Sequence, residues 1–67
     1  MLKKWRRSAG FTQSELACRL GVSQNTVSYW EAGKAKPDLL MAENLSAALN
    51  VSVADIIEHF KVVEGGE

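Results

Sequence analysis

The chain has 67 residues, 46% of them hydrophobic and 24% charged, which is enough for one small domain with a modest core. Its eight basic and eight acidic side chains give a formal net charge of zero, which by itself argues weakly against a nucleic-acid partner. The single cysteine, Cys18, excludes an intrachain disulfide, and no apolar run is typical of a secretion signal or a membrane span. We therefore expect a cytoplasmic protein without membrane contact.

The first part of the chain is expected to form two short helices. The first runs from about Leu2 to Ala9. The second occupies about residues 12–20. Thr12 and Glu15 have the spacing of a capping box, in which each side chain satisfies an orphan backbone N–H of the other residue. Gly21 supplies the left-handed residue that ends this helix.

A third helix, at about residues 24–32, has an unusual outer face. Ser23 is expected to cap it, and Val27, Trp30 and the stem of Glu31 fall on its inner side. The outer side carries only short amides, hydroxyls, a phenol and a methyl group, without charge: Asn25, Ser28, Tyr29 and Ala32. Such a surface suits base edges in a major groove better than bulk water.

Two more helices are expected after a loop at residues 33–37. Asp38 is the expected N-cap of the fourth helix, and Asn50 tolerates the left-handed geometry at its end. Ser52 is expected to begin the fifth helix. The inward faces of the two helices read Leu39, Ala42, Leu45, Ala48 and Leu49, then Val53, Ile56, Ile57 and Phe60. We find no strand pattern and no repeat, so the sequence predicts an all-α fold.

Charge is divided unevenly along the chain. Residues 1–36 carry seven lysines and arginines against two glutamates, a net charge of +5, whereas residues 37–67 carry one lysine against six acidic residues, a net charge of −5. The basic half contains the uncharged helix face, so a dipolar molecule would turn that face toward phosphates. The alternative is chance clustering of solvated charges.

Residues 12–33 read TQSELACRLGVSQNTVSYWEAG, and this stretch resembles the helix-turn-helix of the phage-repressor/Cro-like (XRE) family. The resemblance continues through Pro37 and residues 49–52 to Ile57, so it covers most of the chain. It implies a compact five-helix repressor-like DNA-binding domain, in which helices two and three form the helix-turn-helix. We assign residues 1–61 to this domain and residues 62–67 to a flexible C-terminal tail. The matching positions are Thr12, Gln13, Leu16, Ala17, Leu20, Gly21, Val22, Ser23, Thr26, Val27, Ser28, Glu31 and Gly33.

The resemblance also implies roles for individual side chains. Arg6 and Glu31 occupy positions that in this family often hold a partly buried ion pair; the alternative is that Arg6 reaches phosphate or solvent. An Asn or Gln amide pairs bidentately with adenine in the major groove. Base contacts are expected from Gln13, Gln24, Asn25, Ser28 and Tyr29, and phosphate contacts from Thr26, Lys34 and Lys36.

Each of these contacts has a plain alternative. In that alternative, Gln13 would be an ordinary residue of a first helical turn, and Gln24 and Asn25 would be ordinary polar residues of the surface. In the same alternative, the ring of Tyr29 would lie back on the core, and the charged loop lysines would simply be solvated.

Catalysis finds little support in the sequence. His59 is the only histidine, and no second His or Cys lies at metal-ligand spacing. There is no Gly-rich phosphate loop and no Gly-x-Ser-x-Gly elbow. We expect no enzymatic activity, no metal, no cofactor and no small-molecule ligand.

The leading hypothesis is a sequence-specific regulator of transcription that binds double-stranded DNA, most simply a repressor. Alternatives are an antitoxin, the controller protein of a restriction–modification system, and a protein-interaction module that does not bind DNA. Specificity usually comes from two-fold dimers, so a homodimer is expected. Its candidate interface residues are Leu40, Met41, Val62 and Val63, although single exposed apolar residues are also normal.

Overall fold

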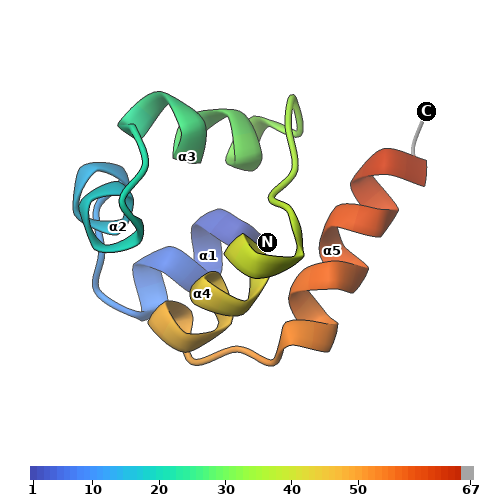
Figure 1. Ribbon diagram of the computed structural model, residues 1–67. Helices are drawn as coiled ribbons and strands as arrows, with labels where there is room; N and C mark the ends of the chain where they lie inside the picture. The colour runs from blue at the N-terminus through green and yellow to red at the C-terminus, as the bar shows by residue number, and fades with distance from the viewer. Residues whose placement is uncertain (66–67) are drawn as a thin grey trace.

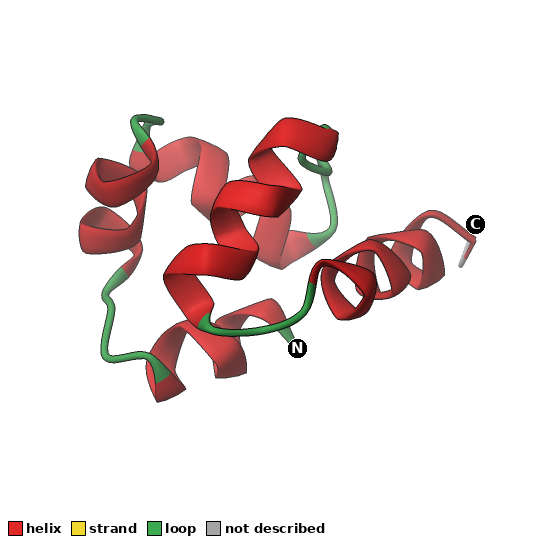
Figure 2. Ribbon diagram, turned by 60° about the horizontal axis from the view of Figure 1, so that its bottom comes forward, coloured by secondary structure: helices red, strands yellow, loops and turns green. Residues whose placement is uncertain are grey.

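The computed structural model describes the backbone of residues 1–65 and the side chains as far as Lys61. This part of the chain forms five helices: α1 (Leu2–Ser8), α2 (Gln13–Leu20), α3 (Gln24–Ala32), α4 (Leu39–Leu49) and α5 (Val53–Gly65). Figure 1 shows α2 and α5 on opposite sides of a centre formed by α1 and α4, with α3 above. Figure 2 shows short loops joining the helices. The predicted all-α fold is confirmed.

The helices begin where the sequence places side-chain oxygens. In each of α2 to α5 a capping oxygen accepts the backbone N–H three residues further on, which satisfies a donor that the helix itself leaves unpaired. The four bonds run from Glu15 to Thr12 (3.0 Å), from Thr26 to Ser23 (3.2 Å), from Met41 to Asp38 (2.8 Å) and from Asp55 to Ser52 (3.1 Å). The backbone N–H of Thr12 also donates to Glu15 Oε1 (2.9 Å), which completes the predicted capping box.

The helix ends also follow the sequence. Gly21 ends α2 in the left-handed region, with φ 74°, and its N–H donates to the carbonyl of Cys18. Asn50 ends α4 with φ 58°, where a residue with a Cβ incurs strain that asparagine tolerates better than most. These two residues set the directions in which α3 and α5 leave the preceding helix.

The core is built around α4, which packs against α1, α2 and α5, while α3 rests on α1 and α2. Its central side chains, Leu45 and Ile56, are fully buried, and each contributes roughly 1.5–3 kcal/mol through removal from water. The complete buried set is Leu2, Leu16, Ala17, Val27, Trp30, Ala42, Leu45, Leu49, Ile56 and Phe60. Every helix contributes to this set, so no helix can be removed without exposing the core.

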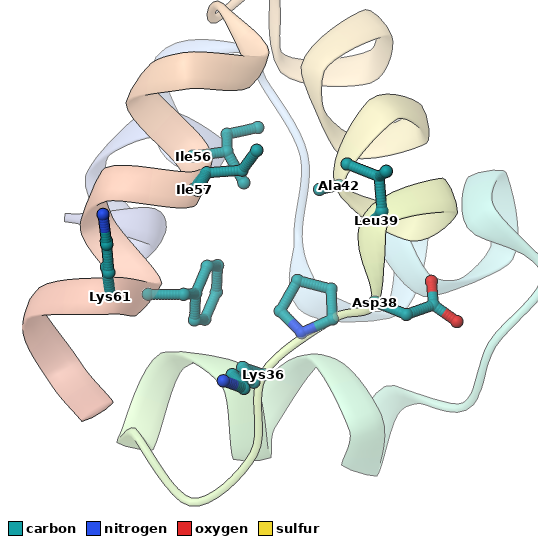
Figure 3. Close-up of a pocket in the computed structure, with 9 residues that line it drawn as sticks. Lys36, Asp38, Leu39, Ala42, Ile56, Ile57 and Lys61 are labelled. Atoms are coloured by element: carbon teal, nitrogen blue, oxygen red, sulfur yellow. The ribbon is translucent and has the colours of Figure 1, made fainter. Parts of the chain in front are cut away.

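The predicted inner face of α4 is wrong at its beginning. Leu39 was expected to be buried, yet it is 63% exposed, whereas Met41, expected to be spare for an interface, is half-buried against the core. Met41 lies one turn before Leu45 on the same stripe, so it reaches the core, while Leu39 lines an open groove between α4 and α5 (Figure 3). Ile57 on α5 is likewise 43% exposed.

Helix α5 extends past the boundary expected between residues 61 and 62. Its backbone is helical to Gly65, through four of the six residues assigned to a tail. The side chains of Val62 and Val63, two of the interface candidates, lie outside the described residues, as do residues 66 and 67. The expected division at residue 61 stays a prediction.

Candidate nucleic-acid interface

Helix α3 presents the uncharged polar face that the sequence indicates. Val27 and Trp30 anchor its inner side, with 0% and 4% of their surface exposed. On the outer side Gln24, Asn25 and Tyr29 are exposed. Tyr29 keeps 51% of its surface open, so its ring does not lie back on the core. The helix is therefore held by two apolar side chains and offers amides and a phenol to the surroundings.

A tight turn sets α3 against α2. After the left-handed Gly21, the N–H of Val22 donates to the carbonyl of Ala17 (3.0 Å), and the Val22 side chain packs at the edge of the core. Ser23 then caps α3, and its hydroxyl also lies 3.0 Å from the hydroxyl of Thr26. Because both ends of the turn are anchored, the two helices keep one relative orientation.

The ion pair expected between Arg6 and Glu31 is present and ties α1 to α3. Arg6 Nε donates to Glu31 Oε2 at 2.6 Å, and the two side chains are only 8% and 7% exposed. A second guanidinium nitrogen donates to the carbonyl of Phe11 (2.7 Å), so Arg6 also holds the segment before α2. Burial by itself raises the pKa of Glu31. Hydrogen bonds from Arg6 and Gln13, with the positive charge of Arg6, outweigh burial and hold that pKa below its usual value.

Gln13 connects this buried pair to the outer surface. Its Nε2 donates to Glu31 Oε1 at 2.9 Å, and its Oε1 lies 3.5 Å from Gln24 Nε2, a long hydrogen bond. A continuous series of polar contacts therefore runs from α1 through Glu31 and Gln13 to the first turn of α3. Sequence reasoning missed this connection. The residues are 18 and 11 positions apart, and no local spacing signals such contacts.

A polar hollow lies beside this network, at the beginning of α2. It is lined by the exposed Arg7 and by four polar side chains, Thr12, Gln13, Ser14 and Gln24, of which Gln13 is half-buried. A helix N-terminus with a nearby guanidinium favours an anionic group. The hollow adjoins the outer face of α3 at Gln24, so an anion here would lie at the edge of that face.

The other end of α3 carries a lysine against the tyrosine. The backbone N–H of Lys34 donates to the carbonyl of Tyr29 (2.9 Å), and the Lys34 ammonium lies 5.8 Å from the Tyr29 ring centroid, at the limit of a cation–π contact. Lys36 is exposed two residues further along the loop. Of the predicted base-contact residues, the structure exposes Gln24, Asn25 and Tyr29 on the outer side of α3, whereas Ser28 on α3 and Gln13 on α2 are half-buried; both lysines follow the end of α3.

The remaining reactive side chains form no site in the described residues. Cys18 is exposed on α2, and the described side chains include no group of three or more His, Cys, Asp or Glu that could bind a metal ion. His59 lies edge-on to Trp5, with ring centroids 5.7 Å apart. Burial, then the positive charge of the amino terminus, lowers the pKa of His59. Within the described chain, no helix has the length and apolar character needed to cross a bilayer.

Two consecutive helices joined by a left-handed glycine, with a polar second helix exposed along its outer face, define a helix-turn-helix domain. The family model described as Helix-turn-helix matches residues 2–56, and the chain belongs to this XRE/Cro-like family. By family it is the DNA-binding domain of an HTH-type transcriptional regulator, and that family is a non-enzymatic one.

Three relatives illustrate the family. An uncharacterised HTH-type transcriptional regulator of Archaeoglobus fulgidus is 36% identical over 55 residues, which cover 82% of this chain and 78% of the relative. One from Methanocaldococcus jannaschii is 38% identical over 55 residues, covering 82% and 83%. The SPbeta prophage-derived regulator YonR of Bacillus subtilis is 43% identical over 51 residues, covering 76% and 47%. No solved structure matches the chain.

Proposed function

We propose that this protein is a sequence-specific repressor that places α3 in the major groove of double-stranded DNA and occludes a promoter. The observation that carries the proposal is the outer face of α3, where exposed amides and a phenol stand without any charged side chain. A groove floor consists of base edges that such groups recognise by hydrogen bonding. The relatives named HTH-type transcriptional regulators support a role in transcription regulation, of which repression is one form.

Base recognition is assigned mainly to the first turns of α3. Gln24 and Asn25 are exposed where a recognition helix enters the groove, and either amide suits the N6 and N7 edge of adenine. Ser28 and Tyr29 lie one turn further on, where the hydroxyls reach base edges or a thymine methyl contacts the ring. Gln13 acts together with Gln24, since its amide oxygen faces the Gln24 nitrogen.

Phosphate contacts surround this face. Lys34 and Lys36 follow α3 in the loop, and Thr26 flanks its first turn. The basic first half of the chain, with its net charge of +5, provides the sequence-independent attraction. The ion pair between Arg6 and Glu31 makes no DNA contact in this proposal. Its role is to hold α3 in one orientation.

A single α3 reads too few base pairs for selective binding, so we propose that two copies bind a site with two-fold symmetry. Their half-sites would be centred about 34 Å apart, one turn of the double helix. Antitoxins and restriction–modification controllers would use the same DNA surface, so these roles differ in the partner and the regulated gene.

Selection of bound duplexes from a random pool tests the proposal. We expect enrichment of a short motif repeated with two-fold symmetry, and an affinity for random duplex that falls steeply with salt. The absence of any binding to duplex DNA at low salt would contradict the proposal and favour a protein-interaction module. Enrichment of a single unrepeated motif would contradict the two-copy arrangement alone.

A further inference from the structure

The polar series from the buried ion pair to the outer face of α3 has a direction. Arg6 Nε donates to Glu31 Oε2 at 2.6 Å, and Gln13 Nε2 donates to Glu31 Oε1 at 2.9 Å. Gln24 Nε2 then donates to Gln13 Oε1 at 3.5 Å. Every donor in the series therefore points toward Glu31, at its buried end.

The direction is set by Glu31, which only accepts hydrogen bonds. Burial raises the pKa of Glu31, but hydrogen bonds from Arg6 and Gln13, with the charge of Arg6, hold that pKa below its usual value. Neither carboxylate oxygen therefore carries a proton at neutral pH. Because an arginine only donates, Arg6 satisfies Oε2, and Oε1 is left for a donor from Gln13.

The amide of Gln13 transmits this direction, because its nitrogen donates and its oxygen accepts. Turning the amide over would set its oxygen against the carboxylate of Glu31, acceptor against acceptor. A hydrogen bond to a charged group favours the observed orientation by about tenfold or more. The side chain of Gln13 is half-buried, and its oxygen is thus held toward Gln24.

The orientation of Gln24 follows from that of Gln13. One N–H of Gln24 donates to Gln13, which leaves the second N–H and the amide oxygen on an exposed side chain. A donor beside an acceptor matches adenine, in which N7 accepts and N6 donates. Guanine offers two acceptors, N7 and O6, and would be matched by the two N–H groups of a reversed Gln24 amide.

We infer that Glu31 is a specificity-determining residue: through the orientation of the Gln13 amide it makes Gln24 prefer adenine over guanine, without contacting DNA itself. This inference rests on the proposed function, since it requires Gln24 to face a base in the major groove. It is distinct from the bracing of α3 by the ion pair, because bracing needs no particular direction of the two amides. Glu31 is in this sense a positioning residue.

Glu31→Gln reverses the series and keeps the size of the side chain. The amide oxygen at position 31 accepts from Arg6, which has no acceptor to offer, so the new nitrogen faces Gln13 and turns its amide over. Gln24 then turns its oxygen toward Gln13 and both N–H groups toward the base. We expect E31Q to shift the preference for adenine over guanine, at the base pair that Gln24 reads, by at least about tenfold toward guanine.

A restoring variant exchanges the amide and the carboxylate between the two positions. In Q13E/E31Q the carboxylate at position 13 accepts from both neighbours, so Gln24 again donates to it and presents its original pattern. We expect the adenine preference to return to within about threefold of the parent value, while the charge near DNA weakens binding to both duplexes. E15Q is the matched control, because Glu15 bonds only within the capping box of α2, and it should leave the preference unchanged.

Duplexes that differ at one base pair measure these preferences by fluorescence anisotropy, well below the melting temperature of E31Q. That base pair is the one at which Gln24→Ala loses the preference of the parent protein. Partial unfolding lowers both affinities alike, so their ratio reports the amide direction and not the stability. Equal weakening of E31Q on both duplexes, a parent preference for guanine, or no restoration in Q13E/E31Q would overturn the inference. It would also be overturned if Gln24→Ala changed the preference at no base pair.

NMR without DNA separates this inference from the proposed function. In the parent protein the side-chain NH2 protons of Gln13 should show NOEs to the γ-methylene of Glu31, because the Gln13 nitrogen lies 2.9 Å from Glu31 Oε1. In E31Q these NOEs should move to the γ-methylene of Gln24. Unchanged NOEs in E31Q would overturn the inference. Failure of the parent protein to bind any duplex would contradict the proposed function, while the amide directions measured by NMR would still stand.

Discussion

Replacing Glu31 by glutamine tests whether the ion pair with Arg6 holds α3 on α1. The two side chains are 8% and 7% exposed, and Arg6 Nε lies 2.6 Å from Glu31 Oε2. Removing one partner of a buried pair costs about 3–5 kcal/mol, because the other charge is left uncompensated. A glutamine oxygen still accepts from Nε, and Arg6 keeps its bond to the carbonyl of Phe11. We therefore expect E31Q to lower the free energy of unfolding by about 2–3 kcal/mol.

Urea and thermal unfolding followed by circular dichroism measure this loss. In a domain of this size each 1 kcal/mol shifts Tm by about 4–8 °C, so E31Q should melt at least about 8 °C lower. E15Q is the matched control, because Glu15 lies in an exposed capping box that glutamine also completes. It should stay within about 0.5 kcal/mol of the parent protein. The double variant R6M/E31L should recover much of the loss, since no charge remains buried.

The pH dependence of unfolding gives an independent check. The pKa of Glu31 is lowered in the folded protein, so the unfolded chain binds a proton more readily. The stabilisation is present above the ordinary value of 4.5 and is lost as the pH falls through the folded-state pKa. E31Q should lack this part of the acid sensitivity. The reasoning is refuted if E31Q is as stable as E15Q, or if it loses stability in acid as steeply as the parent protein.

Three further expectations concern the turn and the DNA surface. Gly21→Ala adds a Cβ that meets no atom within 4 Å at a φ of 74°, so backbone strain alone should cost about 1 kcal/mol in urea unfolding; unchanged stability would contradict this. Asn25→Ala should weaken binding to the selected duplex by about 1–3 kcal/mol in fluorescence anisotropy and leave random duplex unaffected. Equal losses on both would remove Asn25 from base readout. Lys34→Gln should weaken both alike and reduce the log–log salt slope by about one; an unchanged slope would exclude its phosphate contact.

Much of the fold follows from short-range signals in the sequence. The spacing of Thr12 and Glu15 predicts the beginning of α2, and Gly21 its end, because caps and left-handed turns depend on residues only a few positions apart. The pairing of Arg6 with Glu31 was expected from the family resemblance, since the two residues are 25 positions apart and nothing local indicates it.

The first turn of α4 shows where local signals fail. Leu39 and Met41 are both apolar at helical spacings, so periodicity alone does not tell which of them meets a neighbouring helix. The structure half-buries Met41 and exposes Leu39, because burial depends on which positions of α4 the neighbouring helices contact. The contacts of Gln13 with Glu31 and Gln24 were missed for a related reason, since they require α2 and α3 to be in place first.

The amino-acid sequence by itself determined the five helices, their caps and the uncharged outer face of α3, since each depends on residues within a turn or two. Only the tertiary structure decided that a polar series links Arg6 to Gln24, that the Tyr29 ring faces outward, and that an open groove lies between α4 and α5. These features depend on distances between helices. Packing of the whole core sets those distances, and no segment encodes them alone.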